Sequence, residues 1–94
     1  MAAYLIGHIR VKDPVQWKIY TKGVAKSLTP FGAEIIFRGI RTTVLCGDHS
    51  YSHAVVIKFS DQPTLQQWYR SRAYQDLIPI RDKAADVLLI SYDA

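Results

Sequence analysis

The sequence predicts an α+β domain whose elements follow the order β-α-β-β-α-β, and three observations lead to this fold class. Segments rich in β-branched and aromatic residues lie at both ends and in the middle of the chain. An aspartate closely followed by a proline occurs at Asp13-Pro14 and at Asp61-Gln62-Pro63, a pattern typical of a helix start. The length of 94 residues fits one hydrophobic core, so we interpret residues 1–94 as a single domain.

The first strand and the first helix are predicted from the segment that ends at Leu28. Residues Tyr4–Val11 favour a strand, and the proline that follows Asp13 ends it and opens the helix. Lysines at every fourth position are expected to face water: Lys18, Lys22 and Lys26. Apolar residues at helical spacing predict the buried face: Trp17, Tyr20, Val24 and Leu28, supported by Val15 and Ile19.

The middle of the chain predicts two strands in antiparallel pairing. Residues 29–32 contain Pro30 and Gly32 and end the helix. Residues Ala33–Arg38 then alternate in polarity, Gly39 indicates either a bulge or a close approach, and Arg41–Cys46 is expected to continue as extended chain. His53–Phe59 is the third strand, and its short connection to the second predicts antiparallel pairing.

The last part of the chain predicts a second helical region and a fourth strand. Leu65, Trp68 and Tyr69 form the apolar stripe of a helix that begins after Asp61. Ser71 is a helix cap, and a further helical stretch from about Tyr74 to Lys83 is interrupted near Pro79. Residues Asp86–Tyr92 close the chain as a strand.

This order is that of ferredoxin-like domains, in which right-handed crossovers place both helical regions on one face of a four-stranded antiparallel sheet. The other face has no cover within the chain. Yet Val87–Ile90 and Val55–Ile57 are apolar at consecutive positions, so both faces of these strands are apolar. We therefore expect a homodimer in which two sheets pack face to face.

The composition argues against a disulfide-stabilised, exported, membrane-spanning or nucleic-acid-binding protein. Cys46 is the only cysteine, so no internal disulfide forms, and a reducing cytoplasm is the expected location. The apolar run at the N-terminus is broken by His8 and Arg10, which predicts neither export nor a membrane span. The net charge of +4 is scattered, and the lysines of the first helix lack interleaved aromatic residues or glycines. Nucleic-acid binding is therefore not expected.

An ordered set of short motifs along the whole chain resembles the domain-of-unknown-function family numbered 1330. The residues that carry the resemblance are Val11-Lys12-Asp13-Pro14, Trp17, Tyr20, Gly32, Phe37-Arg38-Gly39, Leu45-Cys46-Gly47-Asp48, Val56-Ile57-Lys58-Phe59-Ser60, Trp68-Tyr69-Arg70-Ser71, Ala73-Tyr74-Gln75 and Arg81. This resemblance implies membership of the dimeric α/β-barrel superfamily, whose members join two ferredoxin-like sheets and enclose a cavity between sheet and helices. Relatives in that superfamily include cofactor-independent and haem-degrading monooxygenases, lactone isomerases and binding proteins.

Two departures from the family pattern bear on mechanism. The family usually has a glutamate just before the phenylalanine of the third strand, where this chain has Lys58. The usual Ser-Pro-Glu-Tyr is replaced by Ser71-Arg72-Ala73-Tyr74. A mechanism that uses the family's glutamate as a general base therefore does not transfer to this chain.

Strand alternation predicts a polar patch on the face toward the barrel, made of His8, Glu34, Arg38 and Lys58. In one interpretation the patch binds a small acidic ligand, with Arg38 as a planar clamp, Lys58 as a point charge and His8 titrating near neutrality. In the other, these groups form structural ion pairs at the dimer interface or the barrel mouth, for instance Glu34 with Arg38 or Lys58.

The remaining candidates are aromatic, histidine and cysteine side chains. Four aromatic residues are either core or the lining of a pocket for an aromatic ligand: Tyr20, Trp68, Tyr69 and Tyr74, with Tyr69 and Tyr74 the stronger pocket candidates because they match the family. Arg81 is a helix-end charge or a pocket residue. His49 and His53 flank a turn without a third ligand at diagnostic spacing, so we expect exposed loop histidines and no metal. Cys46 is expected to be a small buried strand residue.

These observations leave several functions open. The first is a small-molecule-binding dimer that is either a binding protein or a cofactor-independent enzyme of the oxygenase or isomerase type, with His8, Arg38 or Lys58 stabilising an anion. The alternative is a non-catalytic structural or regulatory dimer that uses the lysines of the first helix to contact an acidic protein. No cofactor is expected for any of them.

Overall fold

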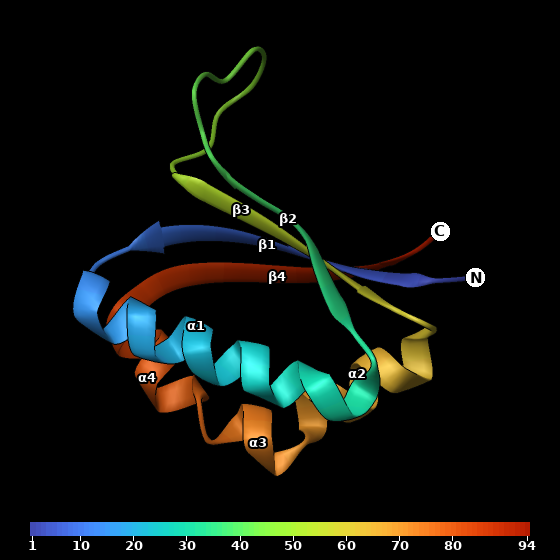
Figure 1. Cartoon of the computed structure of the whole chain (residues 1–94). Helices are drawn as coiled ribbons and strands as arrows, with labels where there is room; N and C mark the ends of the chain where they lie inside the picture. Colours follow the sequence, from blue (N-terminus) through green and yellow to red (C-terminus); the bar gives the residue numbers. More distant parts are fainter.

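A computed structural model describes residues 1–94 and shows one four-stranded antiparallel sheet with all helices on one face (Figure 1). The strands are β1 (Ala3–Val11), β2 (Glu34–Ile40), β3 (His53–Phe59) and β4 (Ala85–Asp93), in the spatial order β2-β3-β1-β4. The helices are α1 (Pro14–Leu28), the 3₁₀ turn η1 (Thr29–Phe31), α2 (Gln62–Arg70), α3 (Arg72–Gln75) and α4 (Ile78–Ala84). This is the predicted ferredoxin-like arrangement. No helix has the length and hydrophobicity needed to span a membrane.

Side-chain caps start the helices where the sequence predicts them. The Asp13 carboxylate accepts hydrogen bonds from the backbone N–H groups of Val15 and Gln16, and Asp61 accepts one from Thr64. The Ser71 hydroxyl oxygen accepts from the backbone N–H of Tyr74 and so caps α3. Each cap satisfies a backbone donor that the first helical turn leaves free. The helical stretch that was predicted from about Tyr74 to Lys83 is divided between two short helices, α3 and α4. The helix is interrupted before Pro79, which lies in the first turn of α4.

The capping carboxylate of Asp61 makes helix α2 sensitive to acid. Hydrogen bonds from the hydroxyl and the backbone N–H of Thr64 lower the pKa of Asp61 below its ordinary value of 3.8. The carboxylate therefore stabilises the fold above that value, and this stabilisation is lost as the pH falls through the lowered pKa. We expect Asp61→Ala to lower the melting temperature near neutral pH, and the gap from the wild type to narrow in acid. Thermal melts across this range check it, with Asp93→Ala as the control. A gap that stays constant into strong acid would contradict the cap.

The outer face of α1 corrects one prediction from the helical pattern. Val15 and Ile19 were expected to support the core, but their side chains are 69% and 48% exposed. They lie on the same outward face as the exposed lysines, whereas Tyr20, Val24 and Leu28 are buried. A stripe of one residue per turn, widened by the buried Ser27, is enough to attach this helix to the rest of the domain.

Strand β2 contains a bulge two residues after its start. Ile35 pairs with Ile57 and Phe37 pairs with Val56, so one extra residue, Ile36, lies between two consecutive pairs. Gly39 is therefore not the bulge but the close approach, because a Cβ atom there would lie 2.6 Å from Cζ of Phe37.

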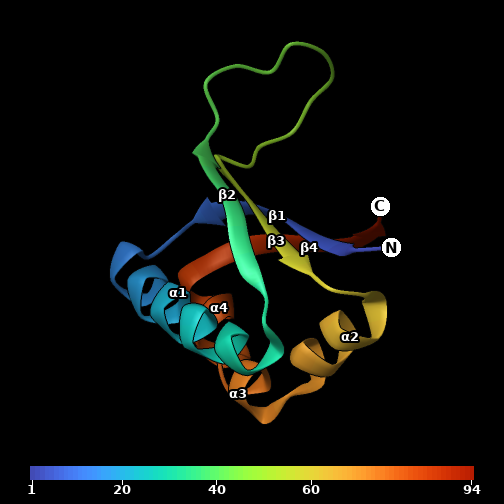
Figure 2. The same cartoon turned by 45° about the vertical axis from the view of Figure 1, so that its right-hand side comes forward.

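Residues 41–52 form a loop without strand structure, which projects beyond the end of the sheet (Figures 1 and 2). The predicted extension of the strand through Cys46 is therefore wrong, and Cys46 is exposed in this loop rather than buried in a strand. The loop is held at its base, where the Arg41 guanidinium donates to the backbone oxygen of His49 at 3.0 Å.

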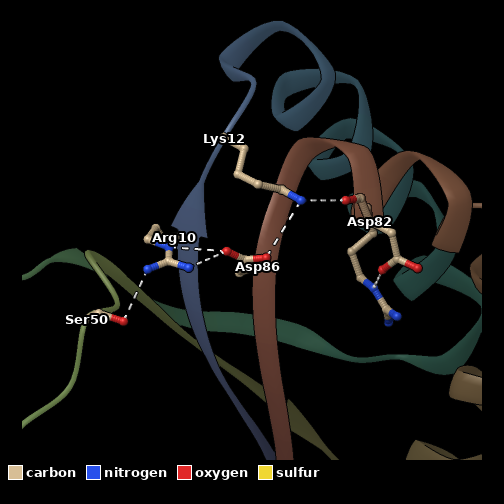
Figure 3. A network of polar contacts seen from close by, with 6 residues as sticks. Arg10, Lys12, Ser50, Asp82 and Asp86 are labelled. Atoms are coloured by element: carbon tan, nitrogen blue, oxygen red, sulfur yellow. Dashed lines mark hydrogen bonds and ion pairs between the residues drawn. The ribbon is translucent and has the colours of Figure 1, made fainter.

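A network of charges ties the loop to the sheet (Figure 3). The Arg10 guanidinium donates to the Asp86 carboxylate, with Nη2 2.5 Å from Oδ2, and to the Ser50 hydroxyl at 3.4 Å. Lys12 lies 3.7 Å from the same carboxylate and donates to the backbone oxygen of Asp82. The hydrogen bond from Arg10 lowers the pKa of Asp86. Since all of these groups are well exposed, the network orients side chains more than it stabilises the fold.

The hydrophobic core lies between the sheet and the helices. Its largest fully buried side chains are Phe59, Trp68 and Tyr74, which come from β3, α2 and α3. The Trp68 and Tyr74 rings are 4.4 Å apart between centroids, and the Trp68 indole N–H donates to the Ser27 hydroxyl at 2.9 Å. These contacts join α1, α2 and α3 beneath the sheet.

The opposite face of the sheet has no helix on it and is largely apolar. Pairing across the strands places these apolar side chains on this open face: Tyr4, Ile6, Phe37, Val56, Leu88, Ile90 and Tyr92. Phe37, Leu88, Ile90 and Tyr92 are exposed in the single chain. An apolar sheet face of this extent is typical of a surface that is covered in an assembly.

Candidate functional site

A cavity of about 520 Å³ lies between the sheet and helix α1. Its walls come from all four strands, from α1 and from Trp68 of α2, and most of the lining is apolar. The apolar lining consists of Leu5, Ile9, Trp17, Tyr20, Val24, Ile35, Ile40, Ala54, Val55, Ile57, Trp68, Val87 and Leu89. The other lining residues are Thr21, Arg38, Gly39 and His53. An apolar cavity of this size with few polar groups in its lining is typical of a small-molecule site.

The bulge in β2 places Arg38 in this cavity. Because Ile36 is the extra residue, Arg38 pairs with Val55, whose side chain is on the helix-covered face. The predicted patch therefore does not form: Arg38 lies on one face, while His8 and Lys58 lie on the other. Arg38 has no hydrogen bond or ion pair to another side chain in the chain. Its guanidinium is free to bind an anionic group.

His53 is another polar residue of the cavity lining. It pairs with Ile40 on β2, one diagonal step from Arg38, and diagonal neighbours on one face of a sheet are about 7–8 Å apart, within reach of long side chains. Its Nδ1 lies 2.8 Å from the Ser52 hydroxyl, so Nε2 is the nitrogen left for a ligand. His53 begins the third strand, as predicted from the strand pattern, but it is half-buried there and is therefore not an exposed loop histidine. No group of three or more His, Cys, Asp or Glu side chains is placed to hold a metal.

A row of hydrogen bonds leads from helix α4 to the cavity wall. The Arg81 guanidinium donates to the Tyr74 hydroxyl oxygen at 3.1 Å, and the Tyr74 and Tyr20 oxygens are 2.9 Å apart. Burial raises the pKa of Tyr20, and the neighbouring Tyr74 raises it further. Desolvation lowers the pKa of Arg81, but hydrogen bonds to Tyr69 and Tyr74 outweigh it, so the net shift is upward. Both groups therefore keep their protons at neutral pH.

The aromatic candidates are sorted differently from the prediction. Tyr20 and Trp68 line the cavity, whereas Tyr69 and Tyr74 do not. Tyr74 is fully buried, packs between the rings of Trp68 and Tyr69, and reaches the cavity only through Tyr20. Arg81 likewise reaches the cavity only through Tyr74 and Tyr20. The sequence contains the right residue types, but it does not show which of them reach the cavity.

The other predicted residues lie on the open face. His8 is half-buried there, with its ring centroid 5.4 Å from that of His49 and 6.1 Å from that of Tyr51, both from the 41–52 loop. These rings border a smaller pocket of about 190 Å³ at the base of the loop. Glu34 and Lys58 are paired directly opposite one another at the other end of the face. They belong to the surface that faces away from the helices.

The sequence matches the family described as Domain of unknown function (DUF1330) over residues 2–92. The chain belongs to this family. A comparison with curated proteins finds no match.

Solved structures with this fold are similar over the whole chain. The RPA0582 protein of unknown function from Rhodopseudomonas palustris is 15% identical and has a TM-score of 0.83, with 99% of this chain and 82% of that chain covered. SnoaB, a cofactor-independent oxygenase from Streptomyces nogalater, is 7% identical and has a TM-score of 0.72, with 99% and 92% covered. A dimeric ferredoxin-like protein of unknown function from Jannaschia sp. CCS1 is 10% identical and has a TM-score of 0.71, with both chains fully covered. At these identities the likeness concerns the fold.

Proposed function

We propose that this protein is a homodimer that binds a small aromatic acid, largely apolar apart from its anionic group, in the cavity between the sheet and α1. The observation that carries the proposal is the cavity of about 520 Å³ with Arg38 in its lining. Ligand cavities in proteins commonly measure roughly 300–1,000 Å³ and combine apolar walls with a few polar groups. The apolar walls would bury the body of the ligand, and Arg38 would bind its anionic group.

The positions of the cations distinguish this proposal from the one suggested by alternation alone. Arg38 lines the cavity and His53 lies one diagonal step away, so an anion bound between them can contact both. Lys58 and His8 lie on the open face and are left out of the ligand site. Glu34 is on that face as well, so no carboxylate lines the cavity to neutralise Arg38.

The open face supports the dimer. Its apolar side chains would lose contact with water if a second copy of the chain covered them, which is the main driving force for association. Two of the similar structures are described as dimeric ferredoxin-like proteins. In a dimer of this kind the sheets pack face to face, and the two cavities remain on the outer, helix-covered sides. We also place the protein in the cytoplasm, where an exposed thiol such as Cys46 stays reduced.

A second candidate is turnover of the ligand in the same cavity, as an oxygenase or isomerase without a cofactor. The observation that favours it is the Ser52–His53 contact. The Ser52 hydroxyl donates to the Ile9 backbone oxygen at 3.4 Å, so its oxygen can accept from the Nδ1–H of His53, and Nε2 is then free to accept a proton. Arg38 would then stabilise the resulting anion. SnoaB, which has this fold, is described as a cofactor-independent oxygenase.

Arg38→Ala is expected to weaken binding of an aromatic carboxylate by about tenfold or more, because a hydrogen bond to a charged group is lost. Isothermal calorimetry with 2-naphthoate measures this, and 2-naphthylmethanol serves as the neutral probe of the same shape. Arg70→Ala is the matched control, since Arg70 is exposed at the end of α2, away from the cavity.

The outcomes separate the alternatives. Loss of carboxylate binding in Arg38→Ala, with alcohol binding unchanged, supports Arg38 as the anion site. Equal carboxylate binding by Arg38→Ala and the wild type would remove Arg38 from the site. Absence of binding by both probes to the wild type would contradict the cavity as a small-molecule site and favour a purely structural or regulatory dimer.

A further inference from the structure

The row Arg81–Tyr74–Tyr20 has an unequal number of donors and acceptors. A guanidinium donates hydrogen bonds and accepts none, so the contact between Arg81 and Tyr74 uses a lone pair of the Tyr74 oxygen. Each tyrosine hydroxyl brings one proton, and only one oxygen–oxygen contact of 2.9 Å is present to receive a proton. One of the two hydroxyl protons is therefore left without an acceptor in the chain.

Burial decides which proton remains. Tyr74 has 0% exposure, and its oxygen contacts only Arg81 and Tyr20. If Tyr20 donated to Tyr74, the Tyr74 proton would be stranded inside the core, which is costly. If Tyr74 donates to Tyr20, the free proton is on a side chain that lines the cavity. The row therefore runs from Arg81 through Tyr74 to Tyr20.

We infer that the Tyr20 hydroxyl donates a hydrogen bond to an oxygen atom of the molecule in the cavity, and that this oxygen is a carbonyl or an enolate. The inference rests on the proposed function, because it requires a ligand in that cavity. Tyr20 as a whole residue is only 6% exposed, so little water is available to its side chain. A ligand oxygen would satisfy the donor that the chain leaves unpaired.

The charge at the far end makes Tyr20 a stronger donor. Arg81 polarises the Tyr74 hydroxyl, and Tyr74 in turn polarises Tyr20, as hydrogen bonds in series do in a dry environment. Burial also raises the pKa of Tyr20, so the hydroxyl remains protonated and remains a donor. A ligand oxygen that gains negative charge would be stabilised most.

Together, the polar groups of the cavity lining define a class of ligand. Arg38 and His53, on the sheet, would bind an anionic group, while Tyr20, on α1, would bind a second oxygen. An apolar acid that also carries a carbonyl group satisfies both. A hydrocarbon acid without the carbonyl would leave the Tyr20 proton unpaired and bind more weakly.

The test compares 1-indanone with indane, which have the same ring frame with and without a carbonyl group. Binding is followed by NMR of the isotope-labelled full chain, and the carbonyl stretch of bound 1-indanone is measured by infrared difference spectroscopy. We expect Tyr20→Phe to weaken ketone binding by about three- to tenfold and to leave indane binding unchanged. The bound carbonyl should absorb at lower frequency in the wild type than in Tyr20→Phe, where it should resemble the ketone in an apolar solvent.

The controls keep the result interpretable. Tyr51→Phe removes a hydroxyl outside the cavity lining and should match the wild type. The infrared frequency in the wild type alone tests the hydrogen bond even if Tyr20→Phe folds poorly. A bound ketone that absorbs as in an apolar solvent, or equal frequencies in wild type and Tyr20→Phe, would overturn the role of Tyr20 and leave the cavity proposal standing. If neither 1-indanone nor indane perturbs the signals of the cavity residues, both the role of Tyr20 and the cavity proposal would be overturned.

Discussion

Replacing Ile90 by lysine is expected to break the proposed homodimer into monomers. Ile90 lies on the open face in β4, an edge strand of the sheet, directly opposite Ile6, which in turn lies opposite Val56. In a face-to-face dimer, a lysine here would be buried without a partner charge, and such a burial costs several kcal/mol. The wild type should sediment at twice the chain mass of 10.7 kDa, and the variant at the chain mass.

Sedimentation velocity at micromolar concentration measures this change. Val15→Lys is the matched control, because it makes the same kind of substitution on the outer face of α1, where the side chain is already exposed. It should leave the dimer intact. A dimeric Ile90→Lys protein, or a monomeric wild type, would show that the open face is not the interface.

Trp68→Ala is expected to lower the free energy of unfolding by about 3–5 kcal/mol, the usual cost of deleting a buried aromatic side chain. Trp68 is 1% exposed, and its ring contacts those of Phe59 and Tyr74 at centroid distances of 5.4 and 4.4 Å. The substitution also removes the donor that the Ser27 hydroxyl accepts from, at a buried position. Few neighbouring side chains can move into the space that the Trp68 ring would leave, because the cavity already lies beside Trp68.

Urea denaturation at a fixed protein concentration measures the loss, since the stability of a dimer depends on concentration. Trp17→Ala is the comparison, because Trp17 is only partly buried and should cost less. A Trp68→Ala variant as stable as Trp17→Ala would mean that the core is not organised around Trp68.

The fold follows from short-range signals that the sequence states directly. Asp13 and Asp61 start helices because their carboxylates satisfy free backbone donors, and the structure shows both caps. The four apolar strand segments then allow few arrangements once the crossovers are right-handed. Strand and helix boundaries accordingly lie within a few residues of the prediction, except along the 41–52 loop.

The candidate site was harder to predict because it depends on one inserted residue. Alternation placed Arg38 beside His8 and Lys58, but the extra residue Ile36 reverses the face of everything after it in β2. No signal in the sequence marks that position as a bulge. The Tyr20–Tyr74 contact joins residues from helices far apart in the chain, so local patterns carry no information about it.

The most direct test of the ligand site is an NMR titration of the methyl-labelled wild type with 2-naphthoate. The cavity and the open face contain different methyl groups, so the signals identify the binding surface. We predict shifts at Val24, Val55 and Leu89, which line the cavity, and no change at Ile6, Leu88 and Ile90 on the open face. Shifts confined to the open face, or no shifts at saturating ligand, would contradict the proposed cavity site.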